Sequence, residues 1–355
     1  MDAALVLSLA DRVAALATRS SMHPDARAIG ARADEWARLR GLVTGDPGSS
    51  PLGRARLDRL AGRIFPQAPA DRVELFARWL IWTYALDDAI DDTSVGNSAT
   101  AVHGLYADLL GTLRRGHAKP EARPLEIALA ELWRQTVPGT DPQWRRRFLR
   151  HMEEHRAGCA EEAVDRRTGR MPTLEEFPGL RRRTAAPFLF DLVEPVLGVT
   201  LDAGLAATPS WKALIESTAD MITWVNDVIS YPKESRPGAP LPVGNYVAVI
   251  GEVHRLEPAE AARRVVDLIA QRAPQVRKSA RALAAELDRL RIGQEGRRDA
   301  AAVVRTLLAA PRAHLDWLTE TGRYTLPAAG SPVVPPSRPA TGLGSRLDDP
   351  ITGPR

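Results

Sequence analysis

The chain has 355 residues, 44% of them hydrophobic and 26% charged, with a formal net charge of +4 at pH 7. That size and apolar content allow one large domain or two ordinary ones. The charge is small and the short arginine runs come with no nucleic-acid-binding motif, so we expect no nucleic-acid partner. The lone Cys159 excludes a disulfide framework and fits a cytoplasmic location. No apolar stretch reaches the roughly 18 residues of a membrane span, and the N-terminal segment lacks the basic start of a signal peptide.

Helical periodicity dominates the chain, and no stretch alternates convincingly as a strand does. The apolar spacing predicts helices over residues 27–43, 54–64, 70–91, 100–115, 124–136, 141–168, 174–196, 211–231, 243–250, 257–289 and 297–321. Turn signals rich in proline and glycine separate several of them. We therefore predict an all-α fold, with one domain over residues 1–326 and a disordered Pro/Gly-rich tail over residues 327–355.

Four aspartates end the apolar helix predicted over 70–91, in the sequence DDAIDD. On a helix Asp87 and Asp91 stack on one face, and Asp88 lies about a quarter-turn away. Like charges at this spacing repel one another, and a helix C-terminus disfavours negative charge. Hard oxygen donors without His or Cys suit Mg²⁺, which is commonly shared with substrate phosphates. The alternative is a solvated acidic helix end that binds nothing.

A second polar stripe ends another apolar helix, in the sequence NDVISYPKE at 226–234. Asn226, Ser230 and Glu234 are four residues apart, so their oxygens line one helix face and could hold a Mg²⁺ ion. Lys233 could reach a phosphate that the same metal touches. Pro232 removes a helical hydrogen bond inside the stripe, so we expect the helix to distort there. The alternative is an ordinary helix end, but the two stretches together predict two metal sites that face each other across a cavity.

These motifs resemble those of the bacterial class I terpene synthases, also called terpene cyclases. DDAID matches the family's DDxxD motif, and NDVISYPKE matches its NDxxSxxxE motif. The segment PTLEEFPGLRRRTAA at 172–186 is similar to the one that carries the family's diphosphate-sensing arginine, and GRYTLP at 322–327 is similar to its C-terminal Arg-Tyr pair. The resemblance implies a single-domain class I terpenoid synthase helical bundle with a central active-site cavity.

The resemblance also implies roles for individual residues. Three Mg²⁺ ions would bind with the substrate, and their protein ligands would be Asp87, Asp88, Asp91, Asn226, Ser230 and Glu234. The diphosphate would be held by Arg181, Lys233, Arg323 and Tyr324. Arg181 lies 45 residues before Asn226, where the family has about 46, so Arg182 stays open as the sensor.

The resemblance also implies one residue near the reacting end of the substrate and several aromatic residues in the cavity wall. The carbonyl of Ala185 would help to trigger ionisation. Tyr84, Trp317 and Phe188 are the expected cavity-lining aromatic residues, and Phe190 is a further candidate. For Trp317 and Phe188, an ordinary place in the core is the alternative.

An enzyme of this family would ionise a linear prenyl diphosphate with Mg²⁺ and cyclise the carbocation to a terpene with release of diphosphate. Farnesyl diphosphate, with 15 carbons, is the expected substrate because it is the commonest in the family. The sequence leaves open whether a C10 or C20 diphosphate is used instead. It also leaves open the product, and whether the last cation loses a proton or captures water. One alternative is an isoprenyl diphosphate synthase, which would carry a second DDxxD motif. The other is a non-catalytic helical binding protein. A homodimer is a further expectation.

Overall fold

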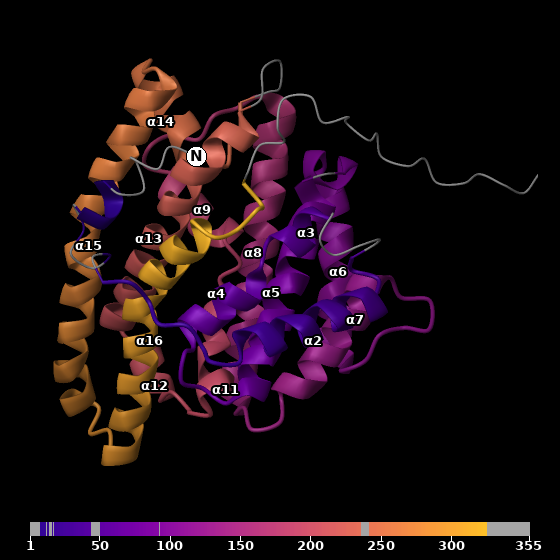
Figure 1. Ribbon diagram of the computed structural model, residues 1–355, viewed down its shortest axis with the longest axis vertical. Helices are drawn as coiled ribbons and strands as arrows, with labels where there is room; N and C mark the ends of the chain where they lie inside the picture. The colour runs from indigo at the N-terminus through magenta and orange to yellow at the C-terminus, as the bar shows by residue number, and fades with distance from the viewer. Residues whose placement is uncertain are drawn as a thin grey trace, which may run out of the picture. The chain divides into compact units, whose positions relative to one another are not determined.

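The structure is a computed structural model that describes residues 8–11, 13, 16, 18–43, 50–91, 93–235 and 241–324. All regular secondary structure in these residues is helical, which confirms the predicted all-α fold (Figure 1). The elements in chain order are α2 (Ala26–Leu39), α3 (Pro51–Arg54), α4 (Leu57–Ile64), α5 (Ala70–Asp91), η2 (Ser94–Asn97), α6 (Ala99–Arg115), α7 (Pro124–Thr136), α8 (Pro142–Thr168), α9 (Phe177–Thr184), α10 (Phe188–Asp191), α11 (Val193–Leu197), α12 (Ala203–Ala206), α13 (Pro209–Glu234), α14 (Tyr246–His254), α15 (Pro258–Arg289) and α16 (Gln294–Leu318). The predicted tail at 327–355 lies outside the described residues.

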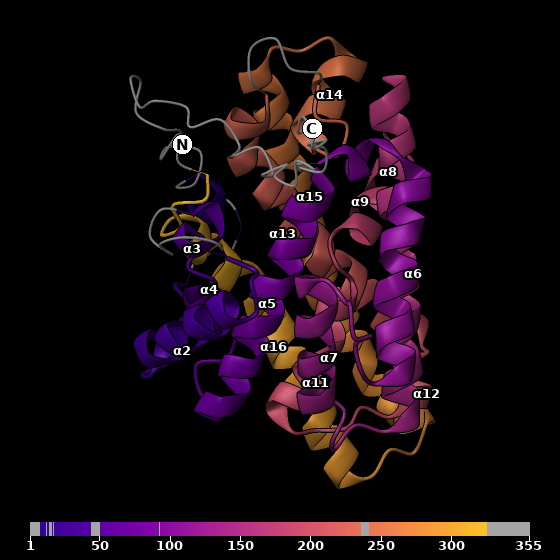
Figure 2. The ribbon, with the colours of Figure 1, turned by 90° about the vertical axis from the view of Figure 1, so that its right-hand side faces the viewer.

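Helix α5 occupies the middle of the bundle and packs against α2, α4 and α7 (Figure 2). Its apolar residues surround most of its circumference, which is the pattern of a helix buried on several sides. Two of its tryptophans fill the space toward α7 and still satisfy their indole N–H groups. Trp79 donates to the Thr136 hydroxyl at 2.9 Å, and Trp82 donates to the Leu125 carbonyl at 2.9 Å. These bonds fix the rotation of α5, and with it the direction in which its last turn points.

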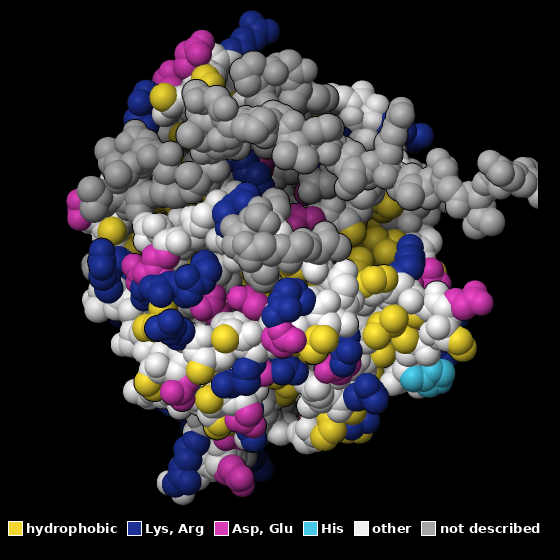
Figure 3. Space-filling model, turned by 45° about the vertical axis from the view of Figure 1, so that its right-hand side comes forward, with side chains coloured by type: hydrophobic (Ala, Val, Ile, Leu, Met, Phe, Trp, Pro, Cys, Tyr) yellow, Lys and Arg dark blue, Asp and Glu magenta, His cyan; other side chains and the backbone are white. Residues whose placement is uncertain are grey.

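Helix α13 packs along α15 and α16, which form a pair of long helices at one edge of the bundle (Figure 1). Helices α6 and α8 run side by side at the opposite edge (Figure 2). None of the described helices combines the length and the apolar character that crossing a bilayer requires. Lys and Arg side chains are interspersed with Asp and Glu over the face shown in Figure 3.

The helix predicted over 174–196 is interrupted, and the structure has the three short helices α9, α10 and α11 in its place. The break falls at Ala186, whose φ of 51° is in the left-handed region, and which precedes Pro187. The ring of a proline disfavours the α conformation of the residue before it, so the helix ends there and starts again. The periodicity continued through this point, and only the proline marked the break. As a result Ala185 is the C-terminal cap of α9 and not a residue inside a helix.

The segment from Arg54 to Arg63 holds the C-terminal end of α16. Trp317 donates from its indole nitrogen to the Ala55 carbonyl at 2.7 Å, and the Gly322 N–H donates to the Arg54 carbonyl at 3.0 Å. Glu320 accepts from Arg59 at 2.6 Å and also pairs with Arg63. Backbone and ionic contacts therefore fix the residues that lead into the Arg323–Tyr324 pair.

His155 ties α6, α8 and α9 together in the core. Its Nδ1 lies 2.6 Å from the Tyr106 hydroxyl, and its Nε2 lies 3.2 Å from the Thr184 carbonyl. The carbonyl can only accept, so Nε2 carries the proton and Nδ1 accepts from the tyrosine. Burial lowers the pKa of His155 from 6.5 to about 4.

We predict that acid destabilises the fold through His155. The imidazole is protonated below about pH 6.5 in the unfolded chain, but only below about pH 4 in the folded chain. The free energy of unfolding is therefore unaffected by this group above pH 6.5 and decreases as the pH falls to about 4. The loss is up to about 3 kcal/mol. Urea unfolding of the wild type and of His155→Gln at a series of pH values isolates this contribution, because the other groups titrate in both proteins. An equal pH dependence in the two proteins would contradict the buried neutral imidazole.

Candidate active site

The first motif lies in the last turn of α5, where the helix emerges from the core. Leu86 and Ile90 are buried there. On the other face of the turn, the side chains of Asp87, Asp88 and Asp91 are 55%, 31% and 51% exposed. The burial of one face therefore directs the carboxylates toward the other. Asp92 lies outside the described residues.

The second motif lies in the last two turns of α13. The helix continues through Pro232 to Glu234, so the expected distortion does not end the helix before the stripe is complete. Asn245, the N-cap residue of α14, donates from Nδ2 to Glu234 at 2.8 Å and lies 3.4 Å from the Ser230 hydroxyl. This contact shows that Ser230 and Glu234 share one side of the helix. The Nζ of Lys233 lies 5.8 Å from the centre of the Tyr324 ring.

Two adjacent residues join the two motifs. Arg323 donates from one guanidinium nitrogen to Asp88 Oδ1 at 2.7 Å, and the same nitrogen lies 3.5 Å from Asp87 Oδ2. The next residue, Tyr324, accepts a hydrogen bond from Asn226 Nδ2 at 2.9 Å. The ends of α5 and α13, about 140 residues apart in the sequence, therefore meet at one place.

Negative charge is concentrated at this meeting point. Although 55% of the Asp87 side chain is exposed, partial loss of hydration raises the pKa of its carboxyl group. The charge of Asp91 raises this pKa further, and the charge of Arg323 lowers it. Burial also raises the pKa of Glu162, and the charges of Asp91 and Glu234 add to the rise. Glu162 therefore experiences the field of both motifs at once. Arg166 compensates part of this charge, since it pairs with Asp91 at 3.0 Å and with Glu162 at 2.9 Å.

Arg181 and Arg182, which the sequence left open as the diphosphate sensor, have different surroundings in the structure. Arg181 lines the cavity below the motifs and pairs with the buried Asp227, at 2.8 Å. Burial alone would lower the pKa of Arg181, but the charge and hydrogen bonds of Asp227 raise it above its ordinary value, so the side chain stays cationic. Arg182 instead pairs with the buried Asp220 at 2.7 Å, which also binds Arg272 at 2.8 Å. Arg182 is not among the described residues that line the cavity.

A cavity of about 210 Å³ lies directly beneath the two motifs. Its walls are mainly aliphatic and aromatic, contributed by α4, α5, α13, α16 and the broken segment around α10. The predicted site residues that line it are Tyr84, Asp87, Arg181, Ala185, Asn226 and Tyr324. The Arg323 guanidinium carbon lies 4.7 Å from the centre of the Tyr84 ring, so this ring is placed between the charged mouth and the apolar interior.

Two of the expected cavity-lining residues lie behind the wall. Trp317 is fully buried, packs edge-on against Tyr84 at 6.0 Å, and uses its N–H on the Ala55 carbonyl. Phe188 is also fully buried, in an aromatic cluster with Trp82, 6.1 Å away. Phe190, two residues on, lines the cavity instead. Because of the break before α10, Phe190 lines the cavity and Phe188 lies in the core behind it. The uninterrupted helix predicted over 174–196 does not show this difference.

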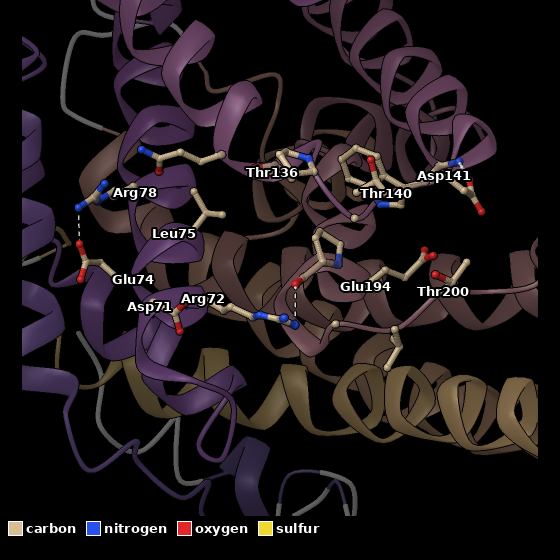
Figure 4. Close-up of a pocket in the computed structure, with 17 residues that line it drawn as sticks. Asp71, Arg72, Glu74, Leu75, Arg78, Thr136, Thr140, Asp141, Glu194 and Thr200 are labelled. Atoms are coloured by element: carbon tan, nitrogen blue, oxygen red, sulfur yellow. Dashed lines mark hydrogen bonds and ion pairs between the residues drawn. The ribbon is translucent and has the colours of Figure 1, made fainter.

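A second hollow, of about 530 Å³, lies between the N-terminal half of α5, the α7–α8 connection and the segment after α11 (Figure 4). Its polar side chains engage the protein itself: Glu74 pairs with Arg78, and Arg72 donates to the Pro195 carbonyl at 3.4 Å. None of the residues that the sequence singled out lines it. Its larger volume alone does not make it the site.

Several residues at the mouth were not predicted from the sequence. Asp227 stands inside the second motif, and its position directly after Asn226 was a signal that could have drawn attention to it. Asn245 and Glu162 had no such signal, because their roles depend on how α14 and α8 pack against α13 and α5.

The residues at the mouth fit a divalent metal. Their side chains offer carboxylate, amide and hydroxyl oxygens, which are the donors that Mg²⁺ prefers. Among the described residues, no three His, Cys, Asp or Glu side chains lie close enough together to enclose a metal by themselves. Mg²⁺ in proteins commonly keeps several waters and takes substrate phosphate oxygens as further ligands.

Comparison with known proteins agrees with this geometry. The family model described as terpene synthase family 2, C-terminal metal binding, matches residues 78–275, a range that includes both motifs. The (−)-δ-cadinene synthase of Streptomyces clavuligerus is 29% identical over 307 residues, which cover 86% of this chain and 92% of that protein. The (+)-T-muurolol synthase of Roseiflexus castenholzii, named as cyclising (2E,6E)-farnesyl diphosphate, is 31% identical over 260 residues, which cover 70% of this chain and 78% of that one.

A solved structure supports the fold. Germacradien-4-ol synthase from Streptomyces citricolor matches with a TM-score of 0.73 and 23% identity, over 86% of this chain and 97% of that one. At 23% identity this similarity shows the fold alone. The family match and the relatives, however, show that the chain is a class I terpene synthase, a member of terpene synthase family 2 that uses a divalent metal.

Proposed function

We propose that the enzyme ionises farnesyl diphosphate with Mg²⁺ and cyclises the resulting carbocation to a terpene. The observation that carries the proposal is the Arg323–Tyr324 pair, which contacts both oxygen-rich motifs above an apolar cavity. A charged mouth can hold a diphosphate while the cavity holds the hydrocarbon chain. The relative named for the cyclisation of farnesyl diphosphate supports the choice of the C15 substrate.

We assign the metal ligands to the two motifs, with Asp87, Asp88 and Asp91 on one side and Asn226, Ser230 and Glu234 on the other. Three Mg²⁺ ions bound with the substrate are part of the proposal. The metal, when bound, would supply positive charge against the charge that develops on the departing diphosphate. One residue of each group contacts the Arg323–Tyr324 pair, namely Asp88 and Asn226, which supports a shared site for the two motifs.

Four residues would hold the diphosphate itself, namely Arg181, Lys233, Arg323 and Tyr324. Arg181 and Arg323 each pair with a carboxylate, at 2.8 Å from Asp227 and 2.7 Å from Asp88. A diphosphate at the mouth offers both guanidinium groups a more highly charged acceptor. Donors arranged beforehand around the leaving group stabilise its charge as the carbon–oxygen bond breaks.

The cavity wall would guide the cation after ionisation. The carbonyl of Ala185, at the end of α9, is assigned to the start of the reaction, where its partial negative charge favours a cation nearby. The rings of Tyr84 and Phe190 can stabilise positive charge over their faces. The aliphatic remainder of the wall folds the chain and excludes water, which would otherwise quench the cation early.

The family match and the relatives favour this function over the two alternatives. An isoprenyl diphosphate synthase and a non-catalytic helical protein would leave the second motif without a role. The homodimer, the cytoplasmic location and the domain limit at residue 326 stay predictions.

Substitution of the metal ligands is expected to abolish turnover. Asp87→Ala and Asn226→Leu should each lower the rate of product formation by about 10²-fold or more, since each removes charge stabilisation at the leaving group. The measurement is gas chromatography–mass spectrometry of the volatile products with farnesyl diphosphate and Mg²⁺, with melting temperatures to confirm folding. Asp71→Ala, at the other end of α5, is the matched control and should stay active. Full turnover in either site variant, or in excess chelator, would remove these ligand assignments.

Mg²⁺ and inorganic diphosphate are expected to bind cooperatively. Mg²⁺ alone must displace Arg323 from Asp88, and diphosphate alone must approach carboxylates, whereas together each neutralises the other. The melting temperature should therefore rise more with both ligands than the sum of the two separate rises. Asn226→Leu should reduce this excess. Additive shifts in the wild type would argue against a shared site.

A further inference from the structure

His314 is a polar side chain in the apolar part of the cavity. It lies on α16 and lines the cavity together with Leu307 and Ala310, which precede it by about two turns and one turn. It is 6% exposed, and its ring packs against Trp317 with centroids 5.3 Å apart. Packing holds the imidazole in place without any polar contact.

Neither ring nitrogen of His314 has a hydrogen-bond partner among the described residues. Nδ1 is enclosed and unsatisfied, whereas Nε2 is not enclosed in this way. The other buried histidines are fully engaged: His23 bonds to Ala68 and Asp25, and His155 bonds to Tyr106 and Thr184. Buried polar groups are nearly always paired, so an unpaired imidazole in a cavity indicates a ligand that it meets there.

The other polar groups of the described cavity wall already have partners. The Thr184 hydroxyl donates to the Arg181 carbonyl at 3.3 Å, and the Thr306 hydroxyl donates to the Ala302 carbonyl at 3.2 Å. Asn226 donates to Tyr324, and Tyr324 is also hydrogen bonded to Tyr84. Within the wall as described, His314 thus offers a lone pair that no protein donor occupies.

The imidazole is neutral in this environment. Burial lowers the pKa of His314 to about 3, and the charge of Arg181 acts in the same direction. A carbocation is a far stronger acid than an imidazolium ion at this pKa, so transfer of a proton from the cation to the ring is still downhill. The same low pKa makes the ring release the proton readily afterwards.

We propose that His314 is the proton acceptor that ends the carbocation sequence, which makes the main product an olefin. In this step a C–H bond next to the cationic carbon breaks and its electron pair becomes the new C=C bond. The proton bonds to the lone pair of a ring nitrogen, which forms an imidazolium ion. The imidazolium then passes the proton to water when the product leaves. This inference rests on the proposed function and adds to it the residue that decides how the reaction stops.

The test compares the wild type with His314→Asn and His314→Ala in the presence of farnesyl diphosphate and Mg²⁺. Asparagine keeps a polar side chain of similar size but does not accept a proton, and melting temperatures confirm folding. We expect the share of the main olefin to fall about tenfold in both variants, with other olefins or alcohols in its place, because a positioned base is lost. The rate of diphosphate release should stay within about threefold, since ionisation precedes this step. His103→Ala, an exposed histidine on α6, is the matched control.

Imidazole added to His314→Ala should restore part of the original product distribution, which a merely structural role would not do. An active wild type with an unchanged product distribution in both variants would overturn the role of His314 alone. A wild-type main product that is an alcohol would overturn it as well. Absence of diphosphate release from the wild type would overturn the proposed function and this inference together.

Discussion

The contact of Arg323 with Asp88 and of Tyr324 with Asn226 is the constraint on which the site depends. Without it, the ends of α5 and α13 would be two acidic helix termini on a large helical protein. Because the two residues are consecutive, they cannot reach their partners unless both helix ends lie within side-chain reach of this one dipeptide. The cavity beneath them follows from this meeting, since α5 and α13 supply facing walls and α16 and the α10 segment supply others.

The arginines at the mouth offset part of its negative charge. Arg323 is held by Asp88, Arg181 by Asp227, and Arg166 by Asp91 and Glu162. An unpaired charge is costly where it is buried, and the largely buried Arg181 and Arg323 each pair with a carboxylate. Substrate binding is then an exchange of partners in which carboxylates gain metal and guanidinium groups gain phosphate. Such an exchange couples the two ligands without requiring a large movement of the helices.

Much of this organisation could be predicted from the sequence, because the periodicity of apolar residues indicates helices and each of the two motifs lies within one short segment. The helix of the first motif was predicted at 70–91 and is found at Ala70–Asp91. What the sequence could not supply were contacts between distant segments, such as that of Asn245 with Glu234. The break at Ala186 was also missed, because the apolar spacing continues across it, and with it the exchange of Phe188 for Phe190 in the wall. His314 was not singled out, since nothing local distinguishes a cavity histidine from one in the core.

The attachment of residues 317–322 to the segment around Ala55 has a consequence for how the enzyme comes into being. Arg323 is positioned by a stretch that is translated some 260 residues earlier. A growing chain that has completed both motifs would already contain this anchor but would still lack Arg323. The contact of Arg323 with Asp88 can therefore form only after almost all of the described chain has been made.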